Sequence, residues 1–164
     1  MRRIFVVLFF AIATVARAAD PTPEEAVKAY LTALKKGDFK EAYHYVSSGM
    51  AQNKDQEEWA KEQQWVMQMS EAKIFDFKVF PGKTEGEKAW VPNLLSSQDK
   101  FLNQLGVEEH ELYSLIREGG RWKVDQQQLV EGPDRNKWFP PDVAGRPAEP
   151  AAAKPGTAKP PQAP

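Results

Sequence analysis

The sequence predicts an α+β domain, with about three N-terminal helices packed on an antiparallel sheet of about four strands. Two observations predict this class. Apolar side chains recur at helical spacing over residues 22–70, and after residue 74 they alternate with polar side chains at the spacing of a strand. Residues 21–139 have the length of one ordinary domain and contain no internal repeat.

The first helix begins at a strong start signal. Thr22 is placed to act as its N-cap, Pro23 takes the first helical position, and Glu25 can complete a capping box. Gly37 supplies the stop. Four apolar side chains then share one face of this helix: Val27, Tyr30, Leu31 and Leu34.

Two further helices follow. Asp38 caps the second helix, whose buried face comprises Phe39, Ala42, Tyr43 and Val46. Because so short a turn joins the first two helices, we expect them to pack as a hairpin. Asp55 caps the third helix, which runs to about Ser70 and has Trp59, Val66 and Met69 on its inner face.

The first two strands are predicted from alternation and turn residues. The first strand has Phe75, Phe77 and Val79 on its buried side and ends at Pro81-Gly82. The second strand covers about residues 87–95, where Pro92 indicates an edge position or a bulge.

The last two strands form a hairpin. The third strand covers about residues 109–117, and Glu118-Gly119-Gly120-Arg121 turns the chain into the fourth, which begins at Trp122. Residues 96–107 lie before this hairpin and fit either a short helix or an ordered excursion at the sheet edge.

The N-terminus has the pattern of a signal peptide. Arg2 and Arg3 precede an apolar run over residues 4–16, and Ala16-Arg17-Ala18 is a small-x-small cleavage site. We expect residues 1–18 to be removed, with cleavage after Ala19 as the alternative. The apolar run is shorter than the roughly 20 residues of a membrane-spanning helix, so an uncleaved anchor is disfavoured. The sequence thus predicts a periplasmic or secreted bacterial protein without stable membrane insertion.

The C-terminus has the composition of a disordered tail. Residues 140–164 consist almost wholly of Pro, Ala, Lys and Gly with a few polar residues, and only Val143 offers an apolar side chain to bury. We interpret this segment as a spacer. The alternative is a docking motif that uses the Lys-Pro steps at residues 154–155 and 159–161.

Composition excludes several kinds of protein. The chain has no Cys, so it has no disulfide, no thiol catalysis and no thiolate metal site. Without the three arginines of the signal peptide, 19 basic residues stand against 23 acidic ones. This net charge of about −4 argues against nucleic acid as a partner.

Several short motifs together resemble the nuclear transport factor two-like superfamily. They are Gly37-Asp38-Phe39 and Ala42-Tyr43 in the second helix, and Gly120-Arg121-Trp122-Lys123-Val124-Asp125 at the last hairpin. The resemblance covers residues 23–130 and is closest to the exported, lipoprotein-like bacterial branch of unknown function, although this chain lacks a lipobox cysteine.

The resemblance implies a cone-shaped fold, in which a curved sheet wraps around the helices and leaves a cavity at its open end. Members of this superfamily include isomerases, dehydratases, hydrolases and purely binding or dimerising modules, so the fold does not select a function. A homodimer through the open sheet face is one arrangement that the resemblance implies.

Catalytic signatures are absent from the sequence, which has no Gly-rich phosphate loop, no zinc-binding His motif and no nucleophile elbow. We interpret His44 as a surface or rim residue and His110 as a solvated residue at a strand end. No metal site and no cofactor is predicted.

A cofactor-free enzyme of this fold would need a carboxylate and a phenol that face one cavity. The carboxylate candidates are Asp76 and Asp125, and the phenol candidates are Tyr30, Tyr43 and Tyr113. Alternation turns both carboxylates away from the apolar side of their strands, unless a bulge reverses them. No catalytic residue is therefore assigned.

Aromatic residues are the most informative set, because Tyr and Trp can present a polar edge to an apolar pocket. They either fill the core or line a pocket for a small apolar ligand: Tyr30, Tyr43, Trp59, Phe75, Phe77, Trp90, Tyr113 and Trp122.

The sequence thus favours an exported, non-enzymatic binding or assembly module, whose partner is a small apolar ligand or a protein. The first alternative is a small isomerase- or hydrolase-type enzyme with its active site in the cone cavity. The second is an envelope interaction protein that acts through its Pro-rich tail.

Overall fold

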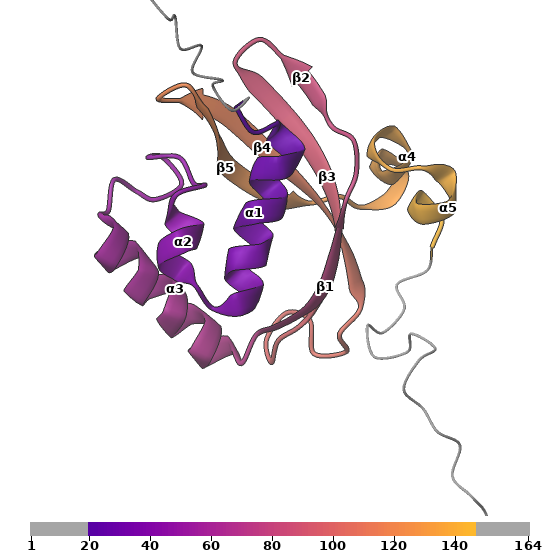
Figure 1. Cartoon of the computed structure of the whole chain (residues 1–164). Coiled ribbons are helices and arrows are strands. Elements are labelled where there is room, and N and C mark those ends of the chain that lie inside the picture. Colours follow the sequence, from indigo (N-terminus) through magenta and orange to yellow (C-terminus); the bar gives the residue numbers. More distant parts are fainter. Residues whose placement is uncertain (1–19, 147–164) are drawn as a thin grey trace, which may run out of the picture.

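The computed structural model describes residues 20–146 (Figure 1). The predicted signal peptide, residues 1–18, and the part of the predicted tail from residue 147 onward lie outside the described residues.

Three helices open the fold, and all three begin at the predicted caps. They are α1 (Pro23–Lys36), α2 (Phe39–Tyr43) and α3 (Gln56–Ser70). Thr22 and Glu25 form the predicted capping box at α1, and Gly37 ends this helix in the left-handed conformation. The second helix is shorter than predicted, since Val46 already lies beyond it and makes a parallel bridge to Val124.

The sheet is antiparallel throughout. Its strands are β1 (Lys73–Val79), β2 (Lys83–Glu85), β3 (Lys88–Gln98), β4 (Glu108–Glu118) and β5 (Arg121–Leu129). The order is β1-β3-β4-β5, and the short β2 extends the edge beside β3. Figure 1 shows α1, α2 and α3 on one side of the curved sheet. The predicted α+β class, with helices packed on an antiparallel sheet, is confirmed.

Each face of the sheet has its own apolar cluster. The inner face, toward α1–α3, packs side chains that include Val27, Leu31, Val91, Leu115 and Val124. The outer face carries a smaller cluster of Phe80, Leu94, Leu112, Val130, Phe139, Val143 and Ala144. Three short helices follow β5 and supply the last of these residues: η1 (Gly132–Asp134), α4 (Arg135–Trp138) and α5 (Pro141–Ala144).

The packed domain extends beyond the predicted boundary at residue 139. The residues from 140 to 146 are not extended, because α5 forms there and Val143 is buried against the outer face. Figure 1 shows α4 and α5 on the opposite side of the sheet from α1–α3. A single Val in a polar, Pro-rich context gives too weak a signal for packing, although this Val provides the contact.

A bulge in β1 changes the predicted face of one aromatic residue. Ile74 pairs with Ser97 and Asp76 pairs with Ser96, so Phe75 is an extra residue in the ladder. Ile74 and Phe77 pack against the inner core, whereas Phe75 is largely exposed. The predicted burial of Phe75 is therefore wrong, while that of Phe77 and Val79 is confirmed in part.

Pro92 lies in a central strand, not at an edge, since β3 pairs with β4 on one side and with β1 and β2 on the other. The Pro92 carbonyl accepts a hydrogen bond from the Phe80 N–H, in the segment between β1 and β2. A strand residue points its N–H and its C=O to the same side, so the missing donor faces this break in the ladder.

Residues 99–107 form an ordered loop, which resolves the open alternative. The Asp99 carboxylate accepts hydrogen bonds from the backbone N–H groups of Phe101, Leu102 and Asn103. These bonds lower the pKa of Asp99, although burial opposes them. The Asn103 amide in turn donates to the carbonyls of Ser97 and Val107, which closes the loop.

Candidate functional site

The inner face of the sheet contains a buried carboxylate that the sequence analysis did not select. Glu111 in β4 is 1% exposed. Its oxygens accept hydrogen bonds from the Asn93 amide at 2.8 Å, the Tyr113 hydroxyl at 3.0 Å and the Gln127 amide at 2.6 Å. The Tyr30 ring of α1 packs edge-on against Tyr113, with ring centroids 6.2 Å apart. We name these five residues the Glu111 cluster.

Burial sets the ionisation of this cluster. Loss of water raises the pKa of Glu111 to about 7, although its three hydrogen-bond donors act in the opposite direction. Burial also raises the pKa values of Tyr30 and Tyr113, and the nearby Glu111 carboxylate raises them further. Both phenols therefore stay protonated near neutral pH.

The signal for Glu111 was present in the sequence but ambiguous. Residues 108–111 read Glu-Glu-His-Glu, which is typical of a solvated strand end. Alternation nevertheless places Glu111 on the same face as Tyr113 and Leu115. Only the register with β3 and β5, which sets Glu111 beside Asn93 and Leu129, shows that this face remains buried so far along the strand.

The Glu111 cluster is closed by protein atoms. Three side-chain donors already occupy the carboxylate, and the Asn93 Oδ1 is buried without a hydrogen-bond partner in the described part of the chain. Neither Glu111 nor Tyr113 lines any of the five best-formed hollows on the described surface of residues 20–146. Glu111 is therefore a buried carboxyl group that can bind a proton near neutral pH.

The eight predicted aromatic residues do not converge on one site. Tyr30 and Tyr113 meet in the Glu111 cluster. Tyr43 and Trp59 pack together between α2 and α3, with ring centroids 5.9 Å apart. Trp122 is buried in the inner core, and Phe77 packs against this core. Phe75 is exposed. Trp90 packs against the apolar cluster of the outer face.

The two predicted carboxylate candidates lie outside the interior. Asp76 is exposed and lies 3.9 Å from the Lys35 ammonium. Asp125 is the extra residue at a bulge in β5, and it accepts a hydrogen bond from the Ser47 hydroxyl at 2.6 Å. Asp125 thereby links β5 to the loop after α2. Asp76 and Asp125 both contact other side chains of the domain.

The two histidines differ from each other. His44 is exposed, as predicted, and its Nε2 lies 3.1 Å from the Gln56 amide. His110 is buried, so its prediction as a solvated residue is wrong. The reason is the C-terminal segment, whose Phe139 ring and Val143 carbonyl cover the imidazole.

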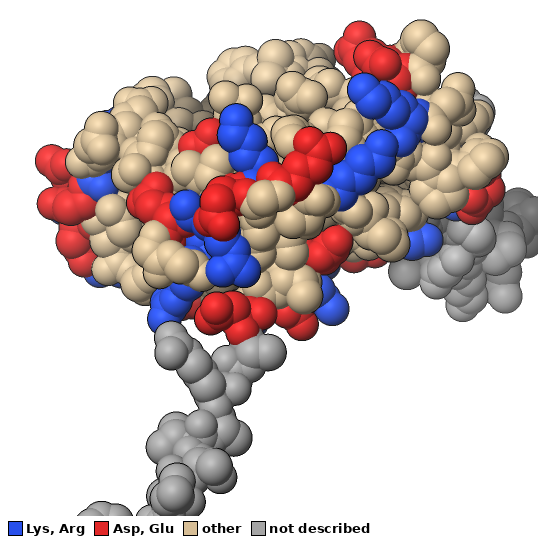
Figure 2. Space-filling model, turned by 90° about the horizontal axis from the view of Figure 1, so that it is seen from above, with Lys and Arg blue, Asp and Glu red and all other residues tan. Residues whose placement is uncertain are grey.

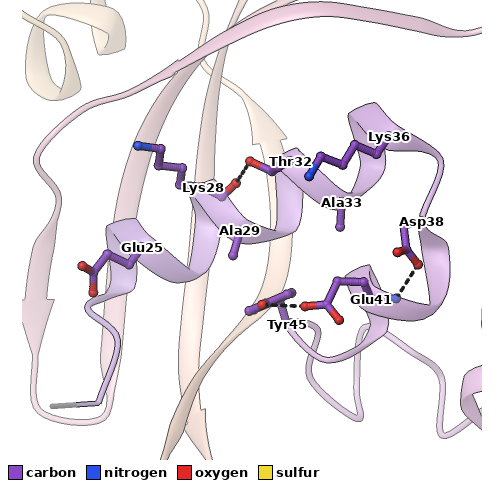
Figure 3. Close-up of a pocket in the computed structure, with 9 residues that line it drawn as sticks. All are labelled: Glu25, Lys28, Ala29, Thr32, Ala33, Lys36, Asp38, Glu41 and Tyr45. Carbon is purple, nitrogen blue, oxygen red and sulfur yellow. Dashed lines mark hydrogen bonds between the residues drawn. The ribbon is translucent and has the colours of Figure 1, made fainter. Parts of the chain in front are cut away.

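A shallow groove of about 400 Å³ runs between α1 and the end of α2. Figure 3 shows Ala29 and Ala33 on the side of α1 that faces Tyr45 and Glu41. The carboxylates around it already have partners within the chain. Asp38 accepts from the backbone N–H of Glu41, and Glu41 accepts from the Tyr45 hydroxyl. The hydrogen bond to Glu41 raises the pKa of the Tyr45 hydroxyl. The groove therefore presents a mainly apolar floor without converging polar groups.

A second surface feature is apolar and strongly exposed. Phe101, Leu102 and Leu105 in the loop after β3 are 61%, 93% and 78% exposed, and Trp65, Val66 and Met69 on α3 are 61%, 44% and 48% exposed. The Lys100 N–H donates to the Ser70 carbonyl at the end of α3, which joins the two elements. Figure 1 shows them at the same end of the molecule. We name these six residues the loop–helix patch.

The helical half of this patch corrects a prediction. Val66 and Met69 are exposed, and only Trp59 of the predicted inner face is buried. Gln63, Met67 and Ser70 are instead half-buried in the second half of α3. The polar Gln63 and Ser70 at two of these positions made the helical pattern ambiguous, and the apolar stripe is the exposed side.

Charges do not concentrate on the face that Figure 2 shows, where basic and acidic side chains lie interspersed. Within residues 20–146, no group of three or more His, Asp or Glu side chains is placed to hold a metal ion. No helix in this described range is both long and apolar enough to span a membrane.

Three helices held inside a curved antiparallel sheet define the nuclear transport factor two-like, or cystatin-like, fold, which the sequence resemblance implies. No family model and no curated protein matches the chain. Among solved structures it is similar to a SEC-C motif containing protein from Rhodopseudomonas palustris. The identity is 14% and the TM-score 0.50, over 66% of this chain and 79% of that chain.

Two further solved structures are more loosely similar. A domain of unknown function with a cystatin-like fold from Nostoc punctiforme is 10% identical, with a TM-score of 0.49 over 68% of this chain and 77% of that one. Bd1075 from Bdellovibrio bacteriovorus is 12% identical, with a TM-score of 0.44 over 63% of this chain. The chain spans only 38% of Bd1075. At 14% identity, the likeness to the Rhodopseudomonas palustris protein shows the fold alone, and nothing is concluded from the two looser likenesses.

Proposed function

We propose that this chain is an exported, non-enzymatic binding or assembly module that contacts a protein partner through the loop–helix patch. The single observation that carries the proposal is the exposure of six large apolar side chains on two elements joined by a backbone hydrogen bond. Exposed apolar residues that gather in one region are typical of interaction sites, whereas scattered ones need no explanation.

The rigid form of the loop supports this role. Asp99 and Asn103 fix the backbone of residues 99–107 by side-chain hydrogen bonds, so Phe101, Leu102 and Leu105 are held in water by an ordered turn. A preorganised apolar loop loses little conformational entropy when it binds. A partner with an apolar groove fits this surface better than a charged one.

Export is the second part of the proposal, and it rests on the signal-peptide pattern of residues 1–18. Cell fractionation followed by N-terminal sequencing tests it. We expect the mature chain outside the cytoplasm, beginning at Ala19 or Asp20. A cytoplasmic chain that retains Arg2 and Arg3 would overturn this part.

Photo-crosslinking tests the binding surface in the cells that make the protein. A photoreactive amino acid replaces Leu102 in one form and Glu85 in another, where Glu85 is an exposed position on β2, at the other end of the molecule in Figure 1. We expect one defined protein adduct from position 102 and none from position 85. No adduct at either position, or the same adducts at both, would contradict the proposal.

The enzyme alternative has one observation in its favour, because Glu111 is a buried carboxylate with a pKa of about 7 beside two phenols. Against it, Asn93, Tyr113 and Gln127 already occupy the carboxylate. Small phenols serve as probes, since they would bind beside Glu111 if the interior were accessible. We expect the NMR signals of Tyr30 and Tyr113 to remain unchanged on addition of p-nitrophenol. A saturable shift that Glu111→Gln removes would favour the enzyme.

A homodimer through the open sheet face, the other predicted partner arrangement, meets an obstacle on the outer face. Phe139, Val143 and Ala144 of the same chain already cover Leu94 and Leu112 there. A second copy would have to bind beside this segment or replace it, so the loop–helix patch is the better supported surface.

A further inference from the structure

The C-terminal segment is held on the outer face of the sheet by few groups. Phe139, Val143 and Ala144 pack against Phe80, Leu94 and Leu112, and Phe80 and Phe139 meet edge-on with ring centroids 5.5 Å apart. The two helices of this segment, α4 and α5, have only four residues each. Helices this short are not stable alone, so their position depends on the contacts with the sheet.

His110 is the polar group at the centre of these contacts. Its Nε2 lies 3.0 Å from the Val143 carbonyl, and its ring stands edge-on to Phe139 with centroids 4.8 Å apart. The other ring nitrogen, Nδ1, is buried and has no hydrogen-bond partner in the described structure. A carbonyl only accepts, so Nε2 carries the proton of the neutral ring and Nδ1 carries the lone pair.

A second proton would be costly at this site. It would create a buried N–H without an acceptor and an imidazolium inside an apolar cluster. Two of the nearby charged side chains, Arg135 of α4 and Arg146 after α5, oppose the positive charge, and Glu108 of β4 favours it. Glu108 is already within 3.8 Å of the Arg146 guanidinium. Burial is the main cause that lowers the pKa of His110, and the two arginines add to it, whereas the hydrogen bond to the Val143 carbonyl acts in the opposite direction.

We propose that His110 and Val143 form a proton-sensitive latch, which holds residues 139–144 on the outer sheet face and releases them when His110 becomes charged. In the released state the imidazolium reaches water, and Phe80, Leu94 and Leu112 lose their cover. Acidification thereby exposes an apolar strip on the outer face. This strip is distinct from the loop–helix patch, so the latch does not depend on the proposed function.

Linkage gives the size of the effect. Protons bind more tightly to the released state, whose His110 has its ordinary pKa near 6.5. Below that pH, each unit of acidification shifts the equilibrium toward release by up to about tenfold, until the pH falls below the pKa of the latched state.

Hydrogen exchange on the mature chain, corrected for the intrinsic pH dependence of exchange, tests the latch. Between about pH 7.5 and pH 5, we expect the protection of residues 139–144 to fall about tenfold while that of α1 and α3 stays constant. His110→Gln keeps a side-chain amide near Val143 but does not titrate, so its protection should be independent of pH. His44→Gln is the matched control and should behave as the wild type.

A second measurement keeps the test valid if His110→Gln fails to hold the segment. In the wild type, the imidazole nitrogen signals of His110 should report the Nε2–H tautomer and an apparent pKa below 6.5. Equal protection of residues 139–144 at both pH values would overturn the latch. An equal loss in wild type and His110→Gln, or a His110 pKa at its ordinary value, would do the same.

Discussion

The two faces of β4 bury neighbouring titratable residues in opposite ways. On the inner face, Glu111 has three side-chain donors, one of which is Tyr113 of the main core, packed against Tyr30 of α1. On the outer face, His110 has one hydrogen bond to a backbone carbonyl and lies under a short C-terminal segment. The inner group is fixed by structure that folds with the domain, whereas the outer group is covered by residues that can leave without unfolding it.

This difference shows that a buried titratable group can either stabilise the fold or make one segment sensitive to pH. A buried polar group with all its partners stabilises one arrangement, and its removal leaves several donors unsatisfied. His110 has one hydrogen-bond partner and a second ring nitrogen without one, so binding of one proton can change which conformation is favoured.

Removal of the Glu111 carboxylate should have the largest effect. Glu111→Ala leaves the amides of Asn93 and Gln127 and the Tyr113 hydroxyl without an acceptor, which we expect to cost about 4 kcal/mol of unfolding free energy. Urea unfolding measures this change. Glu109→Ala, which loses one contact to the half-buried Ser97 hydroxyl, is the control and should cost less than about 1 kcal/mol. Equal losses in both variants would show that the cluster is not special.

The contribution of Glu111 to stability should fall as the pH rises, because burial raises the pKa of this carboxyl group. Its pKa is about 7 in the folded chain against an ordinary value of 4.5, so its contribution favours folding fully below about pH 4.5 and is lost as the pH rises through about 7. Relative to Glu111→Gln, the wild type should lose on the order of 3 kcal/mol between about pH 4 and pH 8. Parallel stability curves of the two proteins would contradict the raised pKa.

The outer face should respond locally. Val143→Ala removes two buried methyl groups, which we expect to cost about 2 kcal/mol and to speed hydrogen exchange in residues 139–144 while α1 stays protected. Truncation after Arg146 is the control. It removes only residues 147–164 of the predicted tail, and its thermal unfolding should match that of the full mature chain. Uniform loss of protection in the Val143 variant would mean that the two faces unfold together.

The smallest expected effect comes from a helix cap. Asp55 accepts a hydrogen bond from the backbone N–H of Glu58 at the start of α3, so Asp55→Ala should cost about 1 kcal/mol. Thermal unfolding measures it, with Asp55→Asn as the control that keeps an acceptor. If α3 is as loosely packed as its exposed stripe indicates, exchange should increase in α3 before it increases in α1.

Local signals predicted the helix starts well. Thr22, Asp38 and Asp55 cap the three helices as expected, because capping depends on residues within one turn. The four predicted strands are present, since alternation and the Gly119-Gly120 turn are local features, whereas the short β2 was not predicted. The fold class followed from these elements and their order.

The site depended on contacts that no local pattern contains. The bulge at Phe75 shifts one strand against its neighbour, and the burial of Glu111 and His110 depends on what covers each face of β4. Val143 and Phe139, far along the chain, cover His110, so its local acidic context was misleading. Tertiary pairing thus decided the residues that local chemistry left ambiguous.

The most direct test of the central claim compares the surface with the interior in one experiment. The mature chain is crosslinked mildly in the cells that make it, purified and weighed by native mass spectrometry as wild type, as Leu102→Asp with Leu105→Asp, and as Glu111→Gln. We expect added partner mass on the wild type and on Glu111→Gln, and none on the double variant. Added mass that persists on the double variant and disappears from Glu111→Gln would place binding in the interior and contradict the account, as would a wild type without any added mass.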